Sequence, residues 1–157
     1  MSALRVLILD FDGVILESNG VKTAVFEEVF AQFPEHHDAM MSFHIQHQSA
    51  SRYVKFAHLV EERLGRAGDQ DLINQLASDF SARIEERMAT CPMVPGATSF
   101  LDRYSGMVPL YLASVTPQTE LNRTLLRRGV NGYFRRAYGC PPWSKENAIV
   151  DVVSQHG

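Results

Sequence analysis

The sequence contains little cysteine and no long hydrophobic run. Its two cysteines, Cys91 and Cys140, are far apart, form no CxxC pair and each precede a proline. This pattern argues against a disulfide framework and favours a reducing compartment. The apolar run near the N-terminus is broken by Asp10 and is too short for a signal-peptide core or a membrane span. We therefore expect a cytoplasmic protein with no membrane partner.

The sequence also has no excess of basic residues. It carries 15 Lys+Arg and 18 Asp+Glu in 157 residues, a formal net charge of −3. That balance excludes the electrostatic footprint typical of a nucleic-acid-binding protein. Hydrophobic residues make up 45% and charged residues 21%, the proportions of a globular chain that can bury a core. The length suits one domain, or a small core with a compact insertion.

Hydrophobic patterning divides the chain into an α/β part and a helical part. The continuous apolar run Val6–Leu9 predicts a buried parallel strand. Over 16–91 apolar residues recur at helical spacing, which predicts a small helical bundle. After a turn-rich segment at 92–96, strands are expected at 108–113 and 133–138, alternating with helices.

This alternation predicts an α/β fold with a doubly wound parallel sheet and an inserted helical bundle. The predicted core is discontinuous, formed by 1–15 and 92–157, and the helical domain is 16–91. Within the core, Thr116 with Pro117 is expected to begin one helix, and Ser144 is expected to cap the last one.

Two carboxylates follow the first predicted strand. Asp10 and Asp12 are one residue apart and precede Gly13. Open α/β sheets bind their ligands beyond the carboxyl ends of such strands. Two aspartates there can bind a hard cation, and one can attack an electrophile while the other transfers a proton. The alternative is a solvated turn with two helix-capping acids.

The run Asp10-Phe11-Asp12-Gly13-Val14-Ile15 resembles the first motif of the haloacid dehalogenase-like superfamily, in its phosphatase and β-phosphoglucomutase-like branch. The resemblance implies that Asp10 is the nucleophile that becomes an aspartyl phosphate and that Asp12 is the general acid/base. It also implies that both bind Mg²⁺. True dehalogenases lack the second aspartate, so Asp12 favours phosphate chemistry over carbon–halogen cleavage.

The segment Leu110–Ser114 resembles the second motif of that family, a hydrophobic strand ending in a hydroxyl residue. The Ser114 hydroxyl and the amides of Val115 and Thr116 are expected to hold phosphate oxygens. Gly13, in the turn after the first strand, is expected to contact the substrate as well. Many buried strands end in serine or threonine, so this segment alone is a weak signal. It indicates a phosphate site only because it is the next strand after the aspartate pair.

Lys145 lies in a proline-containing loop that opens the last predicted helix, which resembles the third motif. A lysine is unfavourable at a helix N-terminus, so its position there indicates another use. It is expected to neutralise Asp10 and the incoming phosphate. The alternative is an exposed surface lysine.

The predicted helical domain contains one candidate substrate residue. The segment 46–52 loosely resembles the family's substrate-specificity segment, and Arg52 could bind the distal group of a phosphorylated substrate. A solvated Arg52 is the alternative. His44 and His47 are too few for a metal site and are expected on the polar surface.

One element of the resemblance is missing. The family has a fourth motif, an acidic loop after a further strand that supplies metal ligands, and nothing after Lys145 matches it. In the family, that further strand lies beside the first. Without it, Val6–Leu9 would be an exposed apolar edge, so we expect an incomplete core. Either the chain is a fragment of a longer protein, or a second chain covers this edge in a homo-oligomer.

The motifs together favour a Mg²⁺-dependent phosphatase-type hydrolase that acts on a small phosphorylated metabolite through an aspartyl-phosphate intermediate. A sugar phosphomutase would use the same residues. The third interpretation is a catalytically inactive or partner-completed module that self-associates. Fold analogy indicates the reaction class and leaves the metabolite open.

Overall fold

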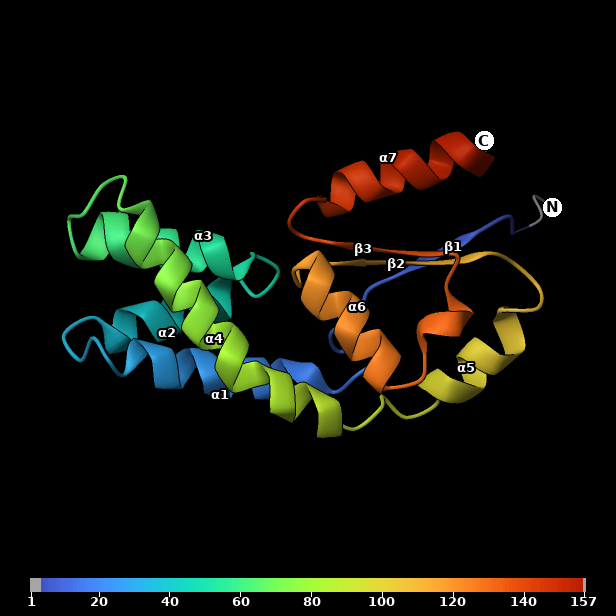
Figure 1. Cartoon of the computed structure of the whole chain (residues 1–157), viewed down its shortest axis with the longest axis horizontal. Coiled ribbons are helices and arrows are strands. Elements are labelled where there is room, and N and C mark those ends of the chain that lie inside the picture. The colour runs from blue at the N-terminus through green and yellow to red at the C-terminus, as the bar shows by residue number, and fades with distance from the viewer. Residues whose placement is uncertain (1–3, 157) are drawn as a thin grey trace. The chain divides into compact units, whose positions relative to one another are not determined.

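A computed structural model describes residues 4–156, and this part of the chain divides into two compact units (Figure 1). Two separate stretches, 4–18 and 89–156, form the first unit. The second unit is the continuous segment 19–88. Each unit has buried apolar residues of its own.

The centre of the first unit is a parallel sheet whose strand order is β1-β2-β3. The strands are β1 (Leu7–Leu9), β2 (Leu110–Ser114) and β3 (Arg136–Gly139). Every residue of β2 is buried because β2 is paired on both sides, whereas all of β1 is only half-buried. Within residues 4–156, β1 lies at the edge of this sheet.

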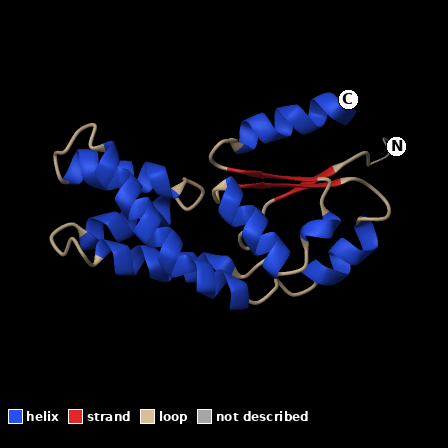
Figure 2. Cartoon of the chain, viewed as in Figure 1, coloured by secondary structure: helices blue, strands red, loops and turns tan. Residues whose placement is uncertain are grey.

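Helices cover both faces of this sheet (Figure 2). The helices α5 (Ala97–Tyr104) and α6 (Gln118–Arg127) lie on one face, and α7 (Lys145–His156) lies on the other. The core beneath α7 contains Tyr111, Ala113, Tyr138, Ala148 and Val152. Burial of a side chain the size of Val152 stabilises the fold by about 1.5–3 kcal/mol relative to exposure. The predicted doubly wound α/β architecture is confirmed.

The third strand begins later than predicted. The expected strand at 133–138 starts only at Arg136, because Asn131–Tyr133 form a 3-10 turn. The Tyr133 hydroxyl donates to the Asp102 carboxylate of α5. This side-chain contact accompanies the turn and is not visible in the hydrophobic pattern.

The sequence predicted the first residues of two helices in the first unit, and the structure confirms one of the two predictions. Pro117, and not Thr116, is the residue that precedes α6. Ser144 caps α7 as expected, since its hydroxyl accepts a hydrogen bond from the Asn147 amide at 3.1 Å.

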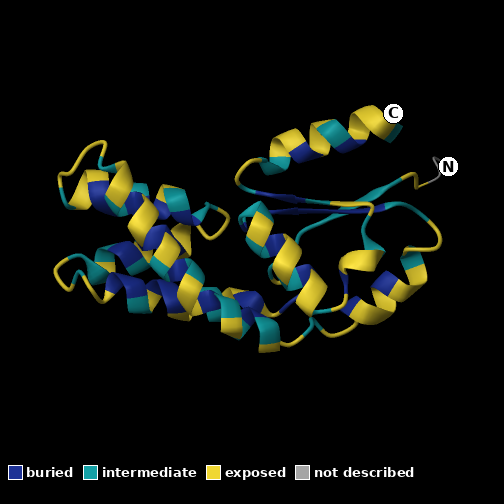
Figure 3. Ribbon diagram, in the orientation of Figure 1, coloured by how far each residue is buried: buried dark blue, intermediate teal, exposed yellow. Residues whose placement is uncertain are grey.

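The second unit is entirely helical around a cluster of aromatic rings. The rings of Phe26 and Phe80 lie 4.4 Å apart, and Phe56 packs against both. Figure 3 shows the buried faces of these helices. The helical elements are α1 (Ser18–Phe30), α2 (His37–Gln46), α3 (Arg52–Ala57), a π-helical turn (His58–Arg63) and α4 (Gln70–Thr90). Within 4–156, no helix combines the length and the apolar character that crossing a membrane requires.

The predicted surface position of His44 is wrong. His44 is 4% exposed, its Nδ1 lies 2.9 Å from the Nζ of buried Lys55, and its Nε2 lies 2.9 Å from the Thr23 hydroxyl. The ring also packs on Phe26, with 4.5 Å between the ring centroids. His47, in contrast, is exposed. The polar composition of 36–47 predicted an exposed segment, whereas α2 buries the His44 side chain.

Candidate active site

The turn after β1 carries both predicted catalytic carboxylates. Phe11, between them, is fully buried, and its carbonyl accepts a hydrogen bond from the Ile15 amide at 2.8 Å. Gly13 has φ 71°, a left-handed conformation that favours glycine, and its amide donates to the Leu16 carbonyl at 2.8 Å. The alternation of acid, apolar residue, acid and glycine thus forms a closed turn at the carboxyl end of β1.

Asp10 is held by groups from two distant parts of the chain. Its Oδ2 lies 2.6 Å from the Nζ of Lys145, which is 135 residues away in sequence. Its Oδ1 accepts a hydrogen bond from the Phe11 amide at 2.7 Å. The side chains of Asp10 and Lys145 are 39% and 30% exposed, so both remain accessible. The first and third motifs therefore meet at one place.

Asp12 contacts two hydroxyl groups. The Ser18 hydroxyl donates to Asp12 Oδ1 at 2.6 Å, and the Ser114 hydroxyl lies at a longer 3.5 Å from Oδ2. Ser18 is fully buried. The sequence interpretation missed Ser18, although a serine at the start of the helical pattern after the first motif was a usable signal.

Two of the three backbone groups predicted to contact phosphate are used within their own loops. The Thr116 amide donates to the Ser114 hydroxyl at 3.0 Å, and the Gly13 amide is bonded to Leu16. Across residues 4–156, the Val115 amide makes no hydrogen bond. The predicted contact of the Val115 amide with a phosphate oxygen stays a prediction.

Gln118 ties the start of α6 to the last residues of β3. Its Oε1 accepts from the Gly139 amide at 2.8 Å, and its Nε2 donates to the Ala137 carbonyl at 3.0 Å. A Cβ added to Gly139 would lie 2.5 Å from the Gln118 Cα, so this approach requires glycine. No motif marks either residue, and the sequence interpretation missed both.

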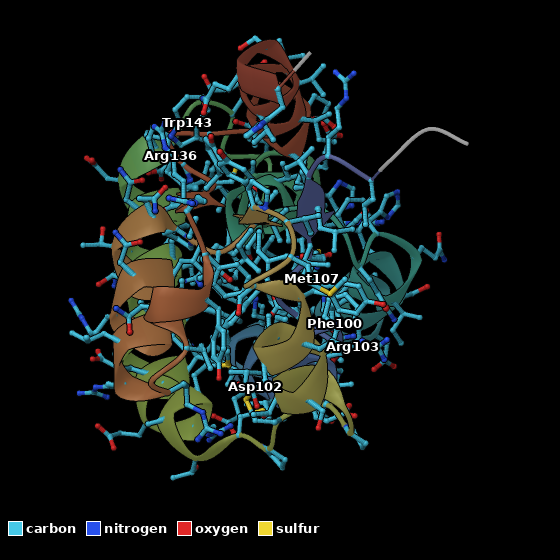
Figure 4. All side chains as sticks on the ribbon, turned by 90° about the vertical axis from the view of Figure 1, so that its right-hand side faces the viewer. Phe100, Asp102, Arg103, Met107, Arg136 and Trp143 are labelled. Atoms are coloured by element: carbon cyan, nitrogen blue, oxygen red, sulfur yellow. The ribbon has the colours of Figure 1, made fainter. Side chains whose placement is uncertain are left out.

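The loop that leads to Lys145 is anchored by Trp143. Its amide donates to the Gly139 carbonyl at 3.0 Å, and its ring meets the Tyr138 ring edge-on at 4.9 Å. The Arg136 guanidinium lies 4.8 Å from the centre of the Trp143 ring (Figure 4). These contacts fix the start of α7 and hence the position of the lysine.

Solved structures share this architecture. A haloacid dehalogenase-like hydrolase from Bacteroides fragilis aligns over 98% of this chain and 73% of its own, with 14% identity and a TM-score of 0.73. The HAD-hydrolase YfnB from Bacillus subtilis, described as bound to magnesium, aligns over 99% and 77%, with 14% identity and a TM-score of 0.63. The chain has the fold of the haloacid dehalogenase-like superfamily.

A third structure with this haloacid dehalogenase-like fold, assigned as a β-phosphoglucomutase from Thermotoga maritima, aligns at 18% identity with a TM-score of 0.56. It covers 87% of this chain, and this chain spans 61% of its length. No protein-family model and no curated protein sequence matches the chain. The family resemblance noted in the sequence is thereby confirmed at the level of the fold.

Within the helical unit of this haloacid dehalogenase-like fold, Arg52 is buried. Only 5% of it is exposed, its Nη1 donates to the Ser81 hydroxyl at 2.6 Å, and its Cζ lies 4.4 Å above the Phe80 ring. The solvated alternative for Arg52 is therefore wrong. Its predicted contact with the substrate stays a prediction, because both of these contacts lie inside the helical unit.

The donor set for a metal ion is small. Within the described part of the chain, no group of three or more His, Cys, Asp and Glu side chains gathers. Mg²⁺ is commonly bound by one or two carboxylates and takes its other oxygens from water and substrate phosphate. The partly exposed Asp10 carboxylate and the backbone carbonyl of Asp12 fit such a limited set.

Proposed function

We propose that this protein is a Mg²⁺-dependent phosphatase-type hydrolase acting on a small phosphorylated metabolite. The observation that carries the proposal is the 2.6 Å contact between Asp10 and Lys145, beside Asp12. An accessible carboxylate next to an ammonium group and a second carboxylate suits nucleophilic attack on an anionic phosphate. The hydrolases that share the fold support the same reaction class.

In the proposed reaction, an Asp10 carboxylate oxygen forms a bond to phosphorus while the bond from phosphorus to the ester oxygen breaks. Asp12 gives its proton to the departing oxygen, which leaves as an alcohol. Water then attacks phosphorus as Asp12 takes back a proton, and the bond to Asp10 breaks to release inorganic phosphate. The hydrogen bond from Ser18 orients Asp12 for both transfers.

The remaining groups hold the phosphoryl oxygens and their charge. Lys145 offsets the negative charge that Asp10 and phosphate bring together. The Val115 amide and the Ser114 hydroxyl are the proposed oxygen-binding groups at the end of β2. Mg²⁺ held by the Asp10 carboxylate and the Asp12 backbone carbonyl would supply additional positive charge next to the phosphate.

The Asp10→Asn variant tests this function. Magnesium-dependent release of phosphate from a panel of small phosphate esters, including p-nitrophenyl phosphate, should fall to background. The exposed Asp71→Asn, in the helical unit, is the matched control and should keep full activity. Circular dichroism of both variants should match the parent chain. Phosphate release that persists in a folded Asp10→Asn protein would contradict the mechanism.

Two alternatives use the same fold. A sugar phosphomutase is favoured by the similarity to the Thermotoga maritima protein and would return the phosphoryl group to a sugar hydroxyl. A sugar monophosphate would then be isomerised without release of inorganic phosphate. An inactive or partner-completed module would show neither product, whatever the state of Asp10.

A further inference from the structure

The side chain of Gln118 extends the pairing between β2 and β3 beyond the point where β2 ends. The Arg135 amide donates to the Leu110 carbonyl at 2.8 Å, so the backbone groups of Arg135 are directed toward β2. Because these directions alternate along an extended chain, the backbone groups of Ala137 and Gly139 are also directed toward β2. Gln118 Nε2 donates to the Ala137 carbonyl at 3.0 Å, and Oε1 accepts from the Gly139 amide at 2.8 Å. The carboxamide therefore pairs with β3 in the way that a further peptide group of β2 would.

Backbone contacts continue this connection into the loop that leads to Lys145. The backbone amide of Gln118 donates to the Pro141 carbonyl at 3.1 Å. The Cys140 amide donates to the Thr116 carbonyl at 2.9 Å. The start of α6 thus lies against the loop after β3, at the carboxyl ends of the strands (Figure 1).

The donors of the Gln118 carboxamide are fully used within the protein. Nε2 also donates to Asn122 Oδ1, one turn along α6, at 2.9 Å. A carboxamide nitrogen carries two N–H donors, so both are engaged. Gln118 is therefore placed to hold other parts of the chain and not to donate a hydrogen bond to substrate.

The distance between Asp10 and Lys145 depends on how the ends of three strands are held together. Asp10 follows β1, which pairs with β2, and Lys145 lies beyond β3. Trp143 anchors the intervening loop to residues of β3. The carboxamide of Gln118, in contrast, connects β3 to the segment that continues β2.

We propose that Gln118 is a positioning residue for Lys145, an inference that rests on the proposed phosphatase function. By pairing with the end of β3, Gln118 fixes where the loop 140–144 begins. That loop places the Lys145 ammonium group 2.6 Å from Asp10. A misplacement of about 1 Å can lower a rate by about 10²-fold, so a side chain that touches no reacting atom controls turnover through this loop.

Phosphate release and the fluorescence of Trp143 together test the role of Gln118. Trp143 is the only tryptophan in the sequence, so its emission reports on this loop without any need for turnover. Gln118→Met removes the hydrogen bonds of the carboxamide. It should lower kcat by about 10–10²-fold, shift the Trp143 emission to longer wavelength and increase its quenching by acrylamide. Gln118→Glu, which sets a carboxylate oxygen against the Ala137 carbonyl, should cause the same changes. Gln75→Met, at an exposed position on α4, is the matched control and should cause none of them.

A double-mutant cycle separates positioning from a general structural role. In a Lys145→Met background, Gln118→Met should lower kcat by less than about twofold, because the group that it positions is already absent. A loss as large as in the parent chain would overturn the positioning role, as would a kcat that Gln118→Met leaves unchanged in an active parent. Unchanged Trp143 fluorescence in a variant whose circular dichroism matches the parent would overturn it whether or not the parent chain is active. A parent chain that releases no phosphate from any ester would overturn the proposed function instead.

Discussion

The two units of this protein treat buried and exposed charge in opposite ways. In the α/β unit, Lys145 meets a carboxylate, Asp10, and both side chains remain partly exposed. In the helical unit, Lys55 is 1% exposed, and the hydrogen-bonding and ring partners of its Nζ within residues 4–156 are uncharged. These are His44 Nδ1 at 2.9 Å, the Gln48 carbonyl at 3.4 Å and the Phe26 ring at 4.7 Å.

The difference separates Lys145, for which we propose a catalytic role, from Lys55, whose burial lowers the stability of the fold. Burial, with repulsion from Lys22, lowers the pKa of Lys55 to about 8. Burial, with repulsion from Lys55, lowers the pKa of His44 to about 4. Because a charged amine without an anion is unfavourable in the interior, the aromatic packing of the helical unit has to offset it. The ion pair between Asp10 and Lys145 has no comparable cost, because both side chains are partly exposed and oppositely charged.

The largest effect is expected from Lys145→Met. Removing the charge next to Asp10 should lower kcat for phosphate release by about 10²–10³-fold. The free energy of unfolding should change by less than about 1 kcal/mol, because the ion pair is partly exposed. Steady-state kinetics and urea denaturation measure the two quantities. A Lys145→Met variant that loses stability and keeps its turnover would contradict the proposed catalytic role of Lys145.

Lys55→Met should show the opposite pattern, with an effect on stability that depends on pH. The folded-state pKa of Lys55 is depressed, so the unfolded chain binds more protons between about pH 8 and 10.5. The stability of the parent should rise through this window by up to about 3 kcal/mol relative to Lys55→Met. Below pH 8 the cost is fully present.

Urea denaturation of both proteins from pH 7 to 11 gives this difference directly, because all other titrating groups are common to them. A flat difference curve would mean that Lys55 keeps an ordinary pKa in the folded chain. Turnover at pH 7 should be little affected, in contrast to the Lys145 variant.

A smaller effect is expected from Ser18→Ala. It removes the hydrogen bond to Asp12 and should lower the free energy of unfolding by about 1 kcal/mol. The activity should fall and its pH dependence should shift, because Asp12 loses a donor to its charged form. Ser154→Ala, at an exposed position on α7, is the control and should leave the pH profile unchanged. Identical pH profiles for the two variants would show that Ser18 has only a structural role.

The α/β unit was the more predictable region from sequence. The apolar run before Asp10 and the one before Ser114 both formed strands, because parallel strands covered on both faces must be continuously apolar. The approach of Lys145 to Asp10 was expected from the resemblance and is present. Motifs identified these residues because their chemistry restricts residue type and spacing together.

Other features could not be predicted, since they depend on contacts between residues far apart in sequence. The inward turn of His44 depends on Lys55 and Thr23, which lie on other helices. The backbones of Gln118 and Gly139 approach each other closely, and the sequence around either residue does not predict this contact. Local patterns describe periodicity, whereas such pairs arise only when the chain has folded.

The contact between Asp10 and Lys145 also bears on the order in which parts of the chain fold. Its two ends are 135 residues apart, and the whole helical unit lies in the loop between them. Closing so long a loop is entropically costly, whereas helices form from neighbouring residues. During folding, the helical segment can therefore organise early, while the ion pair forms only when β2 has paired with both β1 and β3. Recovery of turnover would then mark the completion of the native topology.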